Sequence, residues 1–107
     1  MRLVIVTAPP DDGVSLARTM VEEKLAACAN IVPKVRSIYT WNGKVEDEEE
    51  VMILFKTTDD GIAALTHRIK AIHPYDVPEI ITVEINEREG NPDYFSWVGT
   101  SVYKSSS

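Results

Sequence analysis

The dipeptide Asn42-Gly43, between two long stretches of strand-forming residues, constrains the fold of this chain more than any other feature. Both central residues of a type I′ turn need a positive φ angle, and Asn-Gly is the strongest short-range signal for that two-residue loop. Residues 31–41 show a period of two before it, and residues 44–57 form the return strand after it. The sequence therefore predicts one long β-hairpin.

The two-residue loop also predicts which residues of the hairpin face each other. Paired positions must sum to 85, which places Arg36 opposite Glu49. By the same rule Tyr39 lies opposite Glu46. Because Pro33 cannot donate a backbone hydrogen bond to the ladder, we expect a β-bulge near it that shifts this register.

The predicted hairpin is too long for a chain of 107 residues. Strands of about 11 and 14 residues span roughly 36 and 46 Å at about 3.3 Å per residue. A domain of this length has a radius of gyration of only about 13 Å, so the hairpin should project beyond its own sheet. A projecting ribbon with open edges aggregates unless another chain pairs with it. We therefore interpret the hairpin as an assembly device that closes a symmetric oligomer.

Further strands and helices are expected on both sides of the hairpin. The uncharged tract 3–7 predicts a strand, and residues 79–86 predict another with Ile81, Val83 and Ile85 on one face. The order of elements predicts an α+β fold, a ferredoxin-like βαββαβ sandwich with a long β-hairpin and an extra C-terminal helix. Right-handed crossovers would give a four-stranded antiparallel sheet with two helices on one face.

The helices are predicted from capping residues and from apolar residues at helical spacing. Asp11 or Asp12 is expected to cap the first helix and Asp59 the second. Asn91, followed by a proline and an aspartate, predicts the start of the third. The expected apolar stripes are Val14, Ala17, Val21 and Leu25 in the first helix, Ile62, Leu65, Ile69 and Ile72 in the second, and Tyr94, Trp97, Val98 and Val102 in the third.

Composition and charge disfavour several classes of partner. With 11 basic against 17 acidic residues the net charge is -6, which disfavours nucleic acid. The apolar tract near the N-terminus is too short for a signal peptide or a membrane span. Cys28 is the only cysteine, so no disulfide forms within the chain, which indicates a reducing, cytoplasmic location. We expect one domain over residues 1–104 and a frayed tail at 105–107.

Five segments, in order along the chain, carry a family resemblance. They are Thr7-Ala8-Pro9, Lys24-Leu25-Ala26-Ala27-Cys28-Ala29-Asn30-Ile31-Val32-Pro33, Ser37-Ile38-Tyr39-Thr40-Trp41-Asn42-Gly43-Lys44-Val45-Glu46, Phe55-Lys56-Thr57-Thr58 and His73-Pro74-Tyr75-Asp76-Val77-Pro78-Glu79-Ile80. Together they closely resemble the CutA family, the divalent-cation tolerance proteins. The resemblance implies a ferredoxin-like homotrimer, similar in architecture to the PII signalling proteins, with hairpins that cross between subunits.

Two functional hypotheses stay open at this point. The first, implied by the resemblance, is a trimeric metal-binding or homeostasis protein for tolerance of copper or other divalent cations, which needs no cofactor to fold. The second is a PII-like regulatory trimer that binds a small effector or a partner protein in clefts between subunits. An enzyme is not expected, because the sequence has no Gly-rich phosphate loop and no Ser/His/Asp set in a suggestive context.

The resemblance also points to candidate metal ligands. Copper ligands proposed for bacterial members are a cysteine before Thr-Ala-Pro and a His-His pair before Pro-Tyr, and these positions here are Val6, Ile72 and His73. His73 is a suitable nitrogen donor, but a structural histidine at a helix end is the favoured interpretation. Cys28 is the second candidate and is expected to be buried. His67 is expected to be solvated.

Five residues could line a cleft between subunits, namely Lys56, Tyr39, Trp41, Tyr75 and Glu79. The aromatic rings would supply its walls, although packing of the hairpin explains Tyr39 and Trp41 equally well. Lys56 directly follows an apolar tract and is expected to be almost buried. It therefore needs a carboxylate partner, for which Glu79 or Glu48 is suitable, or it faces an anionic ligand in the cleft.

The run 46–50 consists of five consecutive acidic residues. Clustered carboxylates can hold hard cations. Alternate side chains of a strand point to opposite faces, however, so the five cannot converge on one ion. Pairing across strands or between subunits with Arg36, Lys34 or Lys44 is the favoured interpretation.

Overall fold

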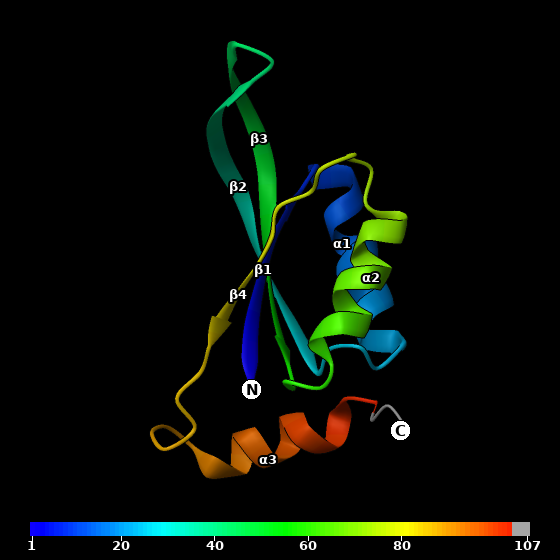
Figure 1. The fold of residues 1–107 in the computed structure, drawn as a ribbon, viewed down its shortest axis with the longest axis vertical. Helices are drawn as coiled ribbons and strands as arrows, with labels where there is room; N and C mark the ends of the chain where they lie inside the picture. The colour runs from blue at the N-terminus through cyan, green and yellow to red at the C-terminus, as the bar shows by residue number, and fades with distance from the viewer. Residues whose placement is uncertain (104–107) are drawn as a thin grey trace.

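The computed structural model describes residues 1–103. In chain order its elements are β1 (Arg2–Ala8), α1 (Pro10–Glu22), β2 (Cys28–Trp41), β3 (Lys44–Thr57), α2 (Ile62–Ile72), β4 (Ile80–Glu84) and α3 (Pro92–Ser101). This order confirms the predicted ferredoxin-like plan with a C-terminal helix (Figure 1). The expected tail at 105–107 lies outside the described residues.

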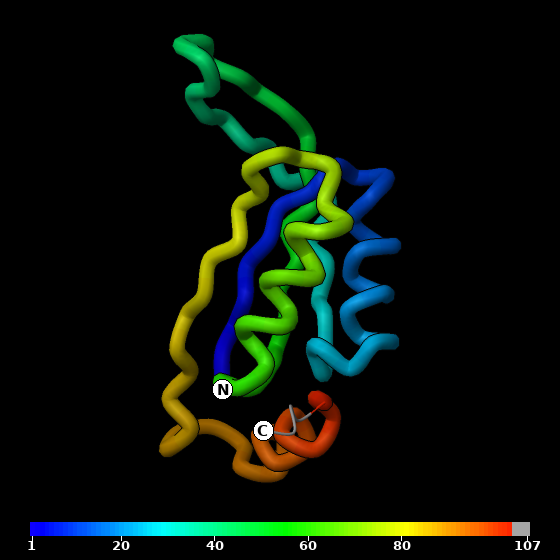
Figure 2. Tube along the Cα trace, turned by 45° about the vertical axis from the view of Figure 1, so that its right-hand side comes forward, coloured from blue at the N-terminus to red at the C-terminus, as the bar shows by residue number. Residues whose placement is uncertain are grey.

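The four strands form one antiparallel sheet in the order β2-β3-β1-β4. As expected for right-handed crossovers, α1 and α2 lie side by side on one face of this sheet. The third helix, α3, crosses beneath one end of the sheet (Figures 1 and 2). No helix within residues 1–103 combines the length and the apolar character needed to cross a membrane.

The hairpin turn has the predicted geometry. The φ angles of Asn42 and Gly43 are +52° and +78°, both in the left-handed region that a type I′ turn requires. The predicted register is confirmed, with the pairs Arg36–Glu49 and Tyr39–Glu46. The local sequence of the turn therefore determines the pairing of the whole outer half of the hairpin.

The predicted bulge is also present, at the position of Pro33. The register shifts between Val32 and Val35, and Lys34 within this interval has a φ angle of +58°. Because the proline lacks an N–H group, it cannot donate to the ladder, and the ladder is interrupted there. The bulge bends the hairpin where it leaves the sheet.

The hairpin projects beyond the rest of the chain, as predicted. Each of its strands has 14 residues. It extends well past α1 and α2 (Figure 1), and the molecule measures 44 × 29 × 22 Å. Three apolar side chains near its end are largely exposed, namely Ile38 (64%), Trp41 (50%) and Val45 (73%). The projecting part therefore presents apolar surface that this chain does not cover.

The core lies between the sheet and the two helices. Val4 and Val6 of β1 and Ile53 and Phe55 of β3 point toward the helices and are fully buried. The helices contribute Leu16, Ala17, Met20, Leu65 and Ile69. Burial of each large apolar side chain contributes about 1.5–3 kcal/mol, so this layer is the main source of stability.

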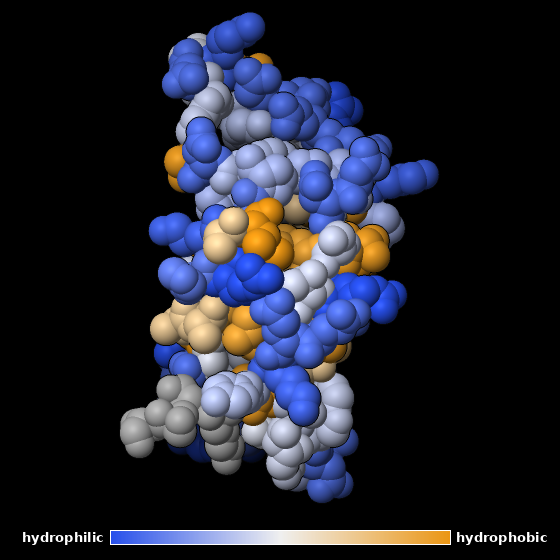
Figure 3. Space-filling view, turned by 90° about the vertical axis from the view of Figure 1, so that its right-hand side faces the viewer, coloured by the Kyte–Doolittle hydropathy of each residue, from blue (hydrophilic) through white to orange (hydrophobic). Residues whose placement is uncertain are grey.

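The buried face of α1 differs from the predicted one. Val14 and Val21 of the expected stripe are 55% and 37% exposed. Apolar side chains gather across the middle of the face that Figure 3 shows. Ala17 of the expected stripe is buried as predicted, but it is joined by Leu16 and Met20 in place of the two valines. Gly13 gives the reason, because a Cβ atom there would lie 2.2 Å from Cγ2 of Val51 on β3. The close approach at this glycine rotates the helix away from the expected face.

Neither of the first two predicted helix caps is correct. α1 begins with Pro9 as its N-cap and Pro10 at its first position, one residue before the expected aspartates, and no side chain caps it. A proline is suited to that first position because its φ angle is already helical. α2 has Gly61 as its N-cap. The carboxylate of Asp59 instead accepts a hydrogen bond from Nε of Arg2, at 3.2 Å.

The later elements agree with the predictions in part: Val98 and Val102 of the stripe expected for α3 are buried, whereas Tyr94 and Trp97 are 36% and 47% exposed. α3 starts as expected, with Oδ1 of Asn91 accepting a hydrogen bond from the N–H of Asp93 at 3.0 Å. Ile72, expected in the stripe of α2, is 38% exposed because it is the last residue of the helix. β4 is shorter than predicted, and Ile81 and Val83 lie on the sheet face that carries no described helix, 51% and 46% exposed.

Candidate functional site

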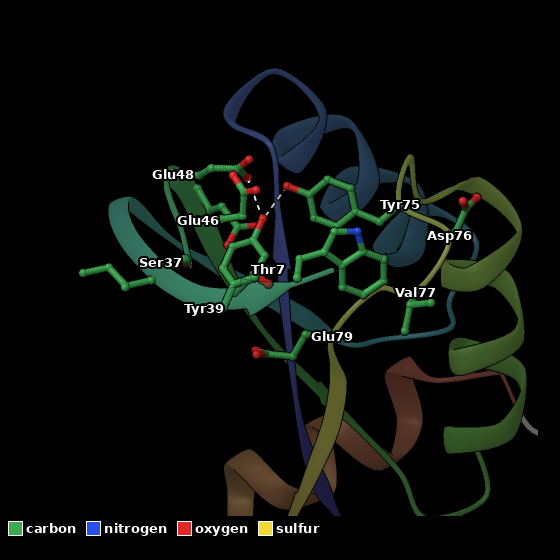
Figure 4. Close-up of a pocket in the computed structure, with 12 residues that line it drawn as sticks. Thr7, Ser37, Tyr39, Glu46, Glu48, Tyr75, Asp76, Val77 and Glu79 are labelled. Atoms are coloured by element: carbon green, nitrogen blue, oxygen red, sulfur yellow. Dashed lines mark hydrogen bonds between the residues drawn. The ribbon is translucent and has the colours of Figure 1, made fainter. Parts of the chain in front are cut away.

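A cavity of about 690 Å³ lies where the hairpin meets the loop that follows α2 (Figure 4). We call it the hairpin pocket. Its walls are formed by Thr7, Ser37, Ile38, Tyr39, Trp41, Glu46, Glu48, Glu50, Tyr75, Asp76, Val77 and Glu79. These residues come from β1, from both strands of the hairpin and from the segment between α2 and β4. The pocket therefore exists only because segments far apart in the sequence meet.

The acidic run on β3 divides between two faces of the strand. Because side chains alternate, Glu46, Glu48 and Glu50 all line the pocket. Asp47 points the other way and accepts two hydrogen bonds from the guanidinium of Arg36, at 2.8 and 2.6 Å. The expected cross-strand pairing with Arg36 thus holds for Asp47, whereas the three glutamates on the other face of the strand line the pocket.

Two tyrosine hydroxyl groups orient these carboxylates. The hydroxyl of Tyr39 donates to Oε2 of Glu48, and that of Tyr75 donates to Oε2 of Glu50, both at 2.9 Å. Figure 4 shows Tyr75 pointing across the pocket toward the acidic side chains of β3. The bond to Glu48 is the main cause that raises the pKa of Tyr39. Burial, followed by the bond to Glu50, raises the pKa of Tyr75 well above its usual value of 10.0. Both phenols therefore remain protonated donors.

The lining of the pocket is acidic. Its carboxylates are Glu46, Glu48, Glu50, Asp76 and Glu79, and none of the described residues that line it is a lysine, arginine or histidine. Glu50 is only 4% exposed. Carboxylates held together in a partly enclosed site produce a negative potential that attracts cations and repels anions.

Four of the five residues predicted for a cleft lie in this pocket, namely Tyr39, Trp41, Tyr75 and Glu79. Lys56 does not. Its ammonium group donates to Oδ1 of Asn30 and lies 3.9 Å from Sγ of Cys28. The partners proposed for it, Glu79 and Glu48, are therefore wrong. The reason is the strand register, which places Cys28 directly opposite Lys56 and Asn30 two residues further along β2.

His73 lies beside the pocket and is only 7% exposed. Its Nε2 is 2.8 Å from the carbonyl oxygen of Thr7, and its Nδ1 accepts a 3.1 Å hydrogen bond from the N–H of Tyr75. Since a carbonyl can only accept, Nε2 carries the proton and Nδ1 is the acceptor. Both ring nitrogens are thus used within the chain, and they hold the backbone of Tyr75 in place.

The donors proposed for copper do not come together in one chain. Cys28 lies opposite Lys56 on β3, and Lys56 in turn pairs with Leu3 on β1. His73 is bonded instead to Thr7, which lies four residues from Leu3 along β1, a distance of roughly 13 Å. Cys28 is also half-exposed rather than buried, and it lies on the sheet face opposite α1 and α2. His67 is exposed on α2. Within residues 1–103 no three His, Cys, Asp or Glu side chains are placed to hold a metal ion, so the residues present do not fit a copper centre.

Comparison with known proteins places the chain in a family. The family model described as "CutA1 divalent ion tolerance protein" matches residues 2–101. The chain belongs to this CutA1 family. It is 44% identical over 97 residues to the divalent-cation tolerance protein CutA of Thermus thermophilus, covering 90% of this chain and 92% of that protein. A CutA homolog of Xenopus laevis is 45% identical over 91% of this chain, which spans only 64% of the Xenopus protein.

Solved CutA structures have the same fold. The PII-like protein CutA from Nostoc sp. PCC 7120, in apo form, superimposes with a TM-score of 0.94 at 35% identity, covering 98% of this chain and 100% of that one. CutA1 from Oryza sativa gives a TM-score of 0.92 at 43% identity, covering 97% and 94%. These relatives confirm the resemblance seen in the sequence and the PII-like architecture expected from it.

In this CutA1-family chain Glu48 and Glu50 line the pocket, although neither was predicted as a site residue. The signal was present in the alternation of β3, where Glu46, Glu48 and Glu50 share one face. The opposite wall of the pocket could not be predicted, because Asp76 and Val77 belong to a loop whose path does not follow from the local sequence. Four of the residues predicted for a cleft between subunits line this cavity of the single chain, and their place in a cleft between subunits stays a prediction.

Proposed function

We propose that this CutA1-family chain acts in divalent-cation tolerance as a cytoplasmic homotrimer that binds cations and catalyses no reaction. The acidic hairpin pocket is the observation that carries the proposal. Five carboxylates line it, and none of the described residues in its lining is basic. Such a surface concentrates cations and excludes anionic ligands. The names of its relatives, which refer to divalent-cation tolerance, support the same conclusion.

The trimeric state is supported by the unpartnered surfaces of the single chain. The hairpin projects with Ile38, Trp41 and Val45 exposed, and β4 leaves one edge of the sheet open. Ile81 and Val83 are half-exposed on the sheet face that carries no described helix. An open edge beside exposed apolar side chains is stabilised when another copy of the chain pairs with it.

The proposal assigns the attraction of cations to the carboxylates of the pocket, which do not by themselves form a three-ligand metal site within residues 1–103. His73 is given a structural role, because both of its ring nitrogens already form hydrogen bonds. Cys28 belongs to no group of three His, Cys, Asp or Glu side chains placed to hold a metal ion within residues 1–103. A site built from separated carboxylates and phenols holds divalent ions weakly, and its affinity falls as protons compete for the oxygens.

Calorimetric titration of Cu(II) and Cu(I) tests this function. The wild type, His73→Ala, Cys28→Ser and Glu48→Gln are titrated as assembled protein at about pH 7.5 and about pH 5.5. We expect saturable binding of the divalent ion, weaker at the lower pH and weaker in Glu48→Gln, and unchanged in Cys28→Ser. An absence of saturable binding of any divalent ion would contradict the metal-tolerance function. Loss of binding in Cys28→Ser would show that the thiol, rather than the pocket, holds the ion.

The second candidate is a PII-like trimer that binds a small effector, and one observation favours it. The hairpin pocket, at about 690 Å³, has the size of sites that hold small organic molecules rather than single ions. Titration with a nucleotide panel and with organic cations separates the two functions. Only the first predicts a stoichiometric response to a divalent metal ion, and only the second predicts a saturable organic ligand.

A further inference from the structure

The dipeptide that determines the hairpin turn also carries a chemical reactivity. The asparagines of the chain are Asn30, Asn42, Asn86 and Asn91, and only Asn42 precedes a glycine. The carboxamide carbon of an asparagine and the backbone nitrogen of the next residue can react within one chain, because their union closes a small ring. A glycine leaves that nitrogen unhindered, since it has no Cβ atom. Asn42 is therefore the position to compare with the other asparagines.

The other asparagines are held by contacts or lack a nitrogen that can attack. Oδ1 of Asn30 accepts a hydrogen bond from the ammonium group of Lys56, and a β-branched residue follows it within β2. Oδ1 of Asn86 accepts a 3.0 Å hydrogen bond from the N–H of Arg88. Asn91 precedes a proline, whose nitrogen carries no hydrogen, and its own carboxamide caps α3.

No such contact holds Asn42. None of the side-chain hydrogen bonds formed within residues 1–103 includes it, and both Asn42 and Gly43 are exposed. The ladder ends at the pair Trp41–Lys44, so the N–H of Gly43 lies outside it. Apart from its chain neighbours, no heavy atom lies within 4 Å of the Cβ position at Gly43. The reacting carbon and nitrogen are thus both free.

The turn stands at the far end of the hairpin, clear of the helices (Figures 1 and 2). Asn42, Gly43 and Lys44 are exposed and polar, so the turn itself offers a second copy of the chain no apolar surface to cover, unlike Ile38 and Val45. Ring closure needs rotation about the Cα–C bond of Asn42, out of the type I′ conformation. A turn that packs against nothing can open in this way without disturbing the core.

We propose that Asn42 is a site of spontaneous covalent modification, where deamidation converts the turn to aspartyl and isoaspartyl forms. The backbone nitrogen of Gly43 attacks Cγ of Asn42. A C–N bond forms between them, and the bond from Cγ to the side-chain nitrogen breaks. That nitrogen leaves as ammonia with the proton that Gly43 gives up, so no oxidant or reductant takes part. Water then opens the cyclic imide, either at Cγ, which gives aspartate, or at the main-chain carbonyl carbon, which gives isoaspartate.

The isoaspartyl form alters the turn, whereas the aspartyl form retains it. In isoaspartate the main chain runs through the Cβ atom of residue 42, which adds an atom to the loop. The loop then loses the type I′ geometry that sets the pairing of the outer hairpin, including Tyr39–Glu46. Asp-Gly, by contrast, also favours a type I′ turn. The effect on assembly rests on the proposed trimer, which the isoaspartyl form should weaken.

Incubation of the assembled protein in mildly alkaline buffer, followed by peptide mapping by mass spectrometry, tests the modification. Asn42 should convert at least about tenfold faster than any other asparagine, because their carboxamides must first lose a hydrogen bond or have no nitrogen to attack them. Methyl transfer by an isoaspartate-specific methyltransferase identifies isoaspartate among the products. Asn42→Gly is the control, since Gly-Gly favours the same turn without a carboxamide, and it should release no ammonia from this position. Equal rates at Asn42 and at Asn30 or Asn86 would overturn the proposal.

Sedimentation of the incubated samples separates this outcome from that of the proposed function. Species smaller than the trimer should be enriched in isoaspartate. Asn42→Gly incubated in parallel, and freshly prepared Asn42→Asp, which adds the charge alone, should both remain trimeric. Isoaspartate shared equally between trimer and smaller species would overturn the effect on assembly. A protein that is monomeric before incubation would contradict the proposed trimer, and the conversion rates at the asparagines would still test the modification.

Discussion

The hydroxyl of Tyr75 donates a 2.9 Å hydrogen bond to the carboxylate of Glu50, which precedes it by 25 residues. The backbone N–H of Tyr75 in turn donates to His73, whose Nε2 is bonded to the carbonyl of Thr7. This chain of contacts ties the loop after α2 to β3 and to β1. It holds together the walls of the hairpin pocket, and disruption at Tyr75 should therefore affect both stability and ligand binding.

Substitution Tyr75→Phe should lower the free energy of unfolding by about 1–2 kcal/mol, because the buried carboxylate of Glu50 loses its hydrogen-bond donor. Urea denaturation at a fixed chain concentration measures this. Tyr39→Phe is the matched control, since it removes the same kind of bond to the exposed Glu48 and should have a smaller effect. Equal effects of the two substitutions would show that burial of Glu50 is not what makes the Tyr75 bond important.

The same phenol predicts how stability depends on alkaline pH. The folded protein raises the pKa of Tyr75 above its usual value of 10.0, chiefly through burial and then through the bond to Glu50. Above that usual value the unfolded chain loses the proton while the folded chain keeps it, so folding stability should fall as pH rises. Urea midpoints measured from about pH 8 to about pH 11 should fall more steeply for the wild type than for Tyr75→Phe. Equal slopes of the urea midpoint against pH in the wild type and in Tyr75→Phe would contradict the assignment of this pH dependence to Tyr75.

Gly13→Ala should destabilise the protein by about 1–3 kcal/mol, because the new Cβ atom would lie 2.2 Å from Cγ2 of Val51 and would push α1 away from β3. Gly99→Ala in α3 is the control. No heavy atom lies within 4 Å of the Cβ position there, and alanine in a helix should stabilise by roughly 0.5–1 kcal/mol. Thermal and urea midpoints of both variants measure the two effects, and a stable Gly13→Ala would show that the helix can move without cost.

Shortening the hairpin should weaken assembly more than folding. Removal of Thr40, Trp41, Lys44 and Val45 takes two residues from each strand, preserves the alternation, and keeps the Asn42-Gly43 turn. The core between the sheet and the two helices contains none of these residues. Analytical ultracentrifugation should show a trimer for the wild type at micromolar concentration and a smaller species for the variant. A monomeric wild type, or a variant that remains trimeric, would contradict the assembly role of the hairpin.

Much of the fold could be predicted because it depends on short-range signals. Asn42-Gly43 determined the turn, and the turn determined the register of the outer hairpin, including the pair Tyr39–Glu46. The missing N–H group of Pro33 determined the position of the bulge. Asn91 determined the start of α3 through its own hydrogen bond to the second residue after it. In each case the residues that decide the outcome are neighbours in the chain.

The face of α1 and the walls of the pocket were decided only by tertiary structure. The rotation of α1 depends on the contact of Gly13 with Val51, and the pocket depends on Tyr75, in the loop after α2, reaching Glu50 on β3. The alternation of β3 by itself determined that Glu46, Glu48 and Glu50 share one face. Whether that face meets solvent, another strand or a loop depends on long-range packing. The contacts between distant segments contribute free energy only after the entropic cost of bringing those segments together has been met, so the local sequence does not determine them.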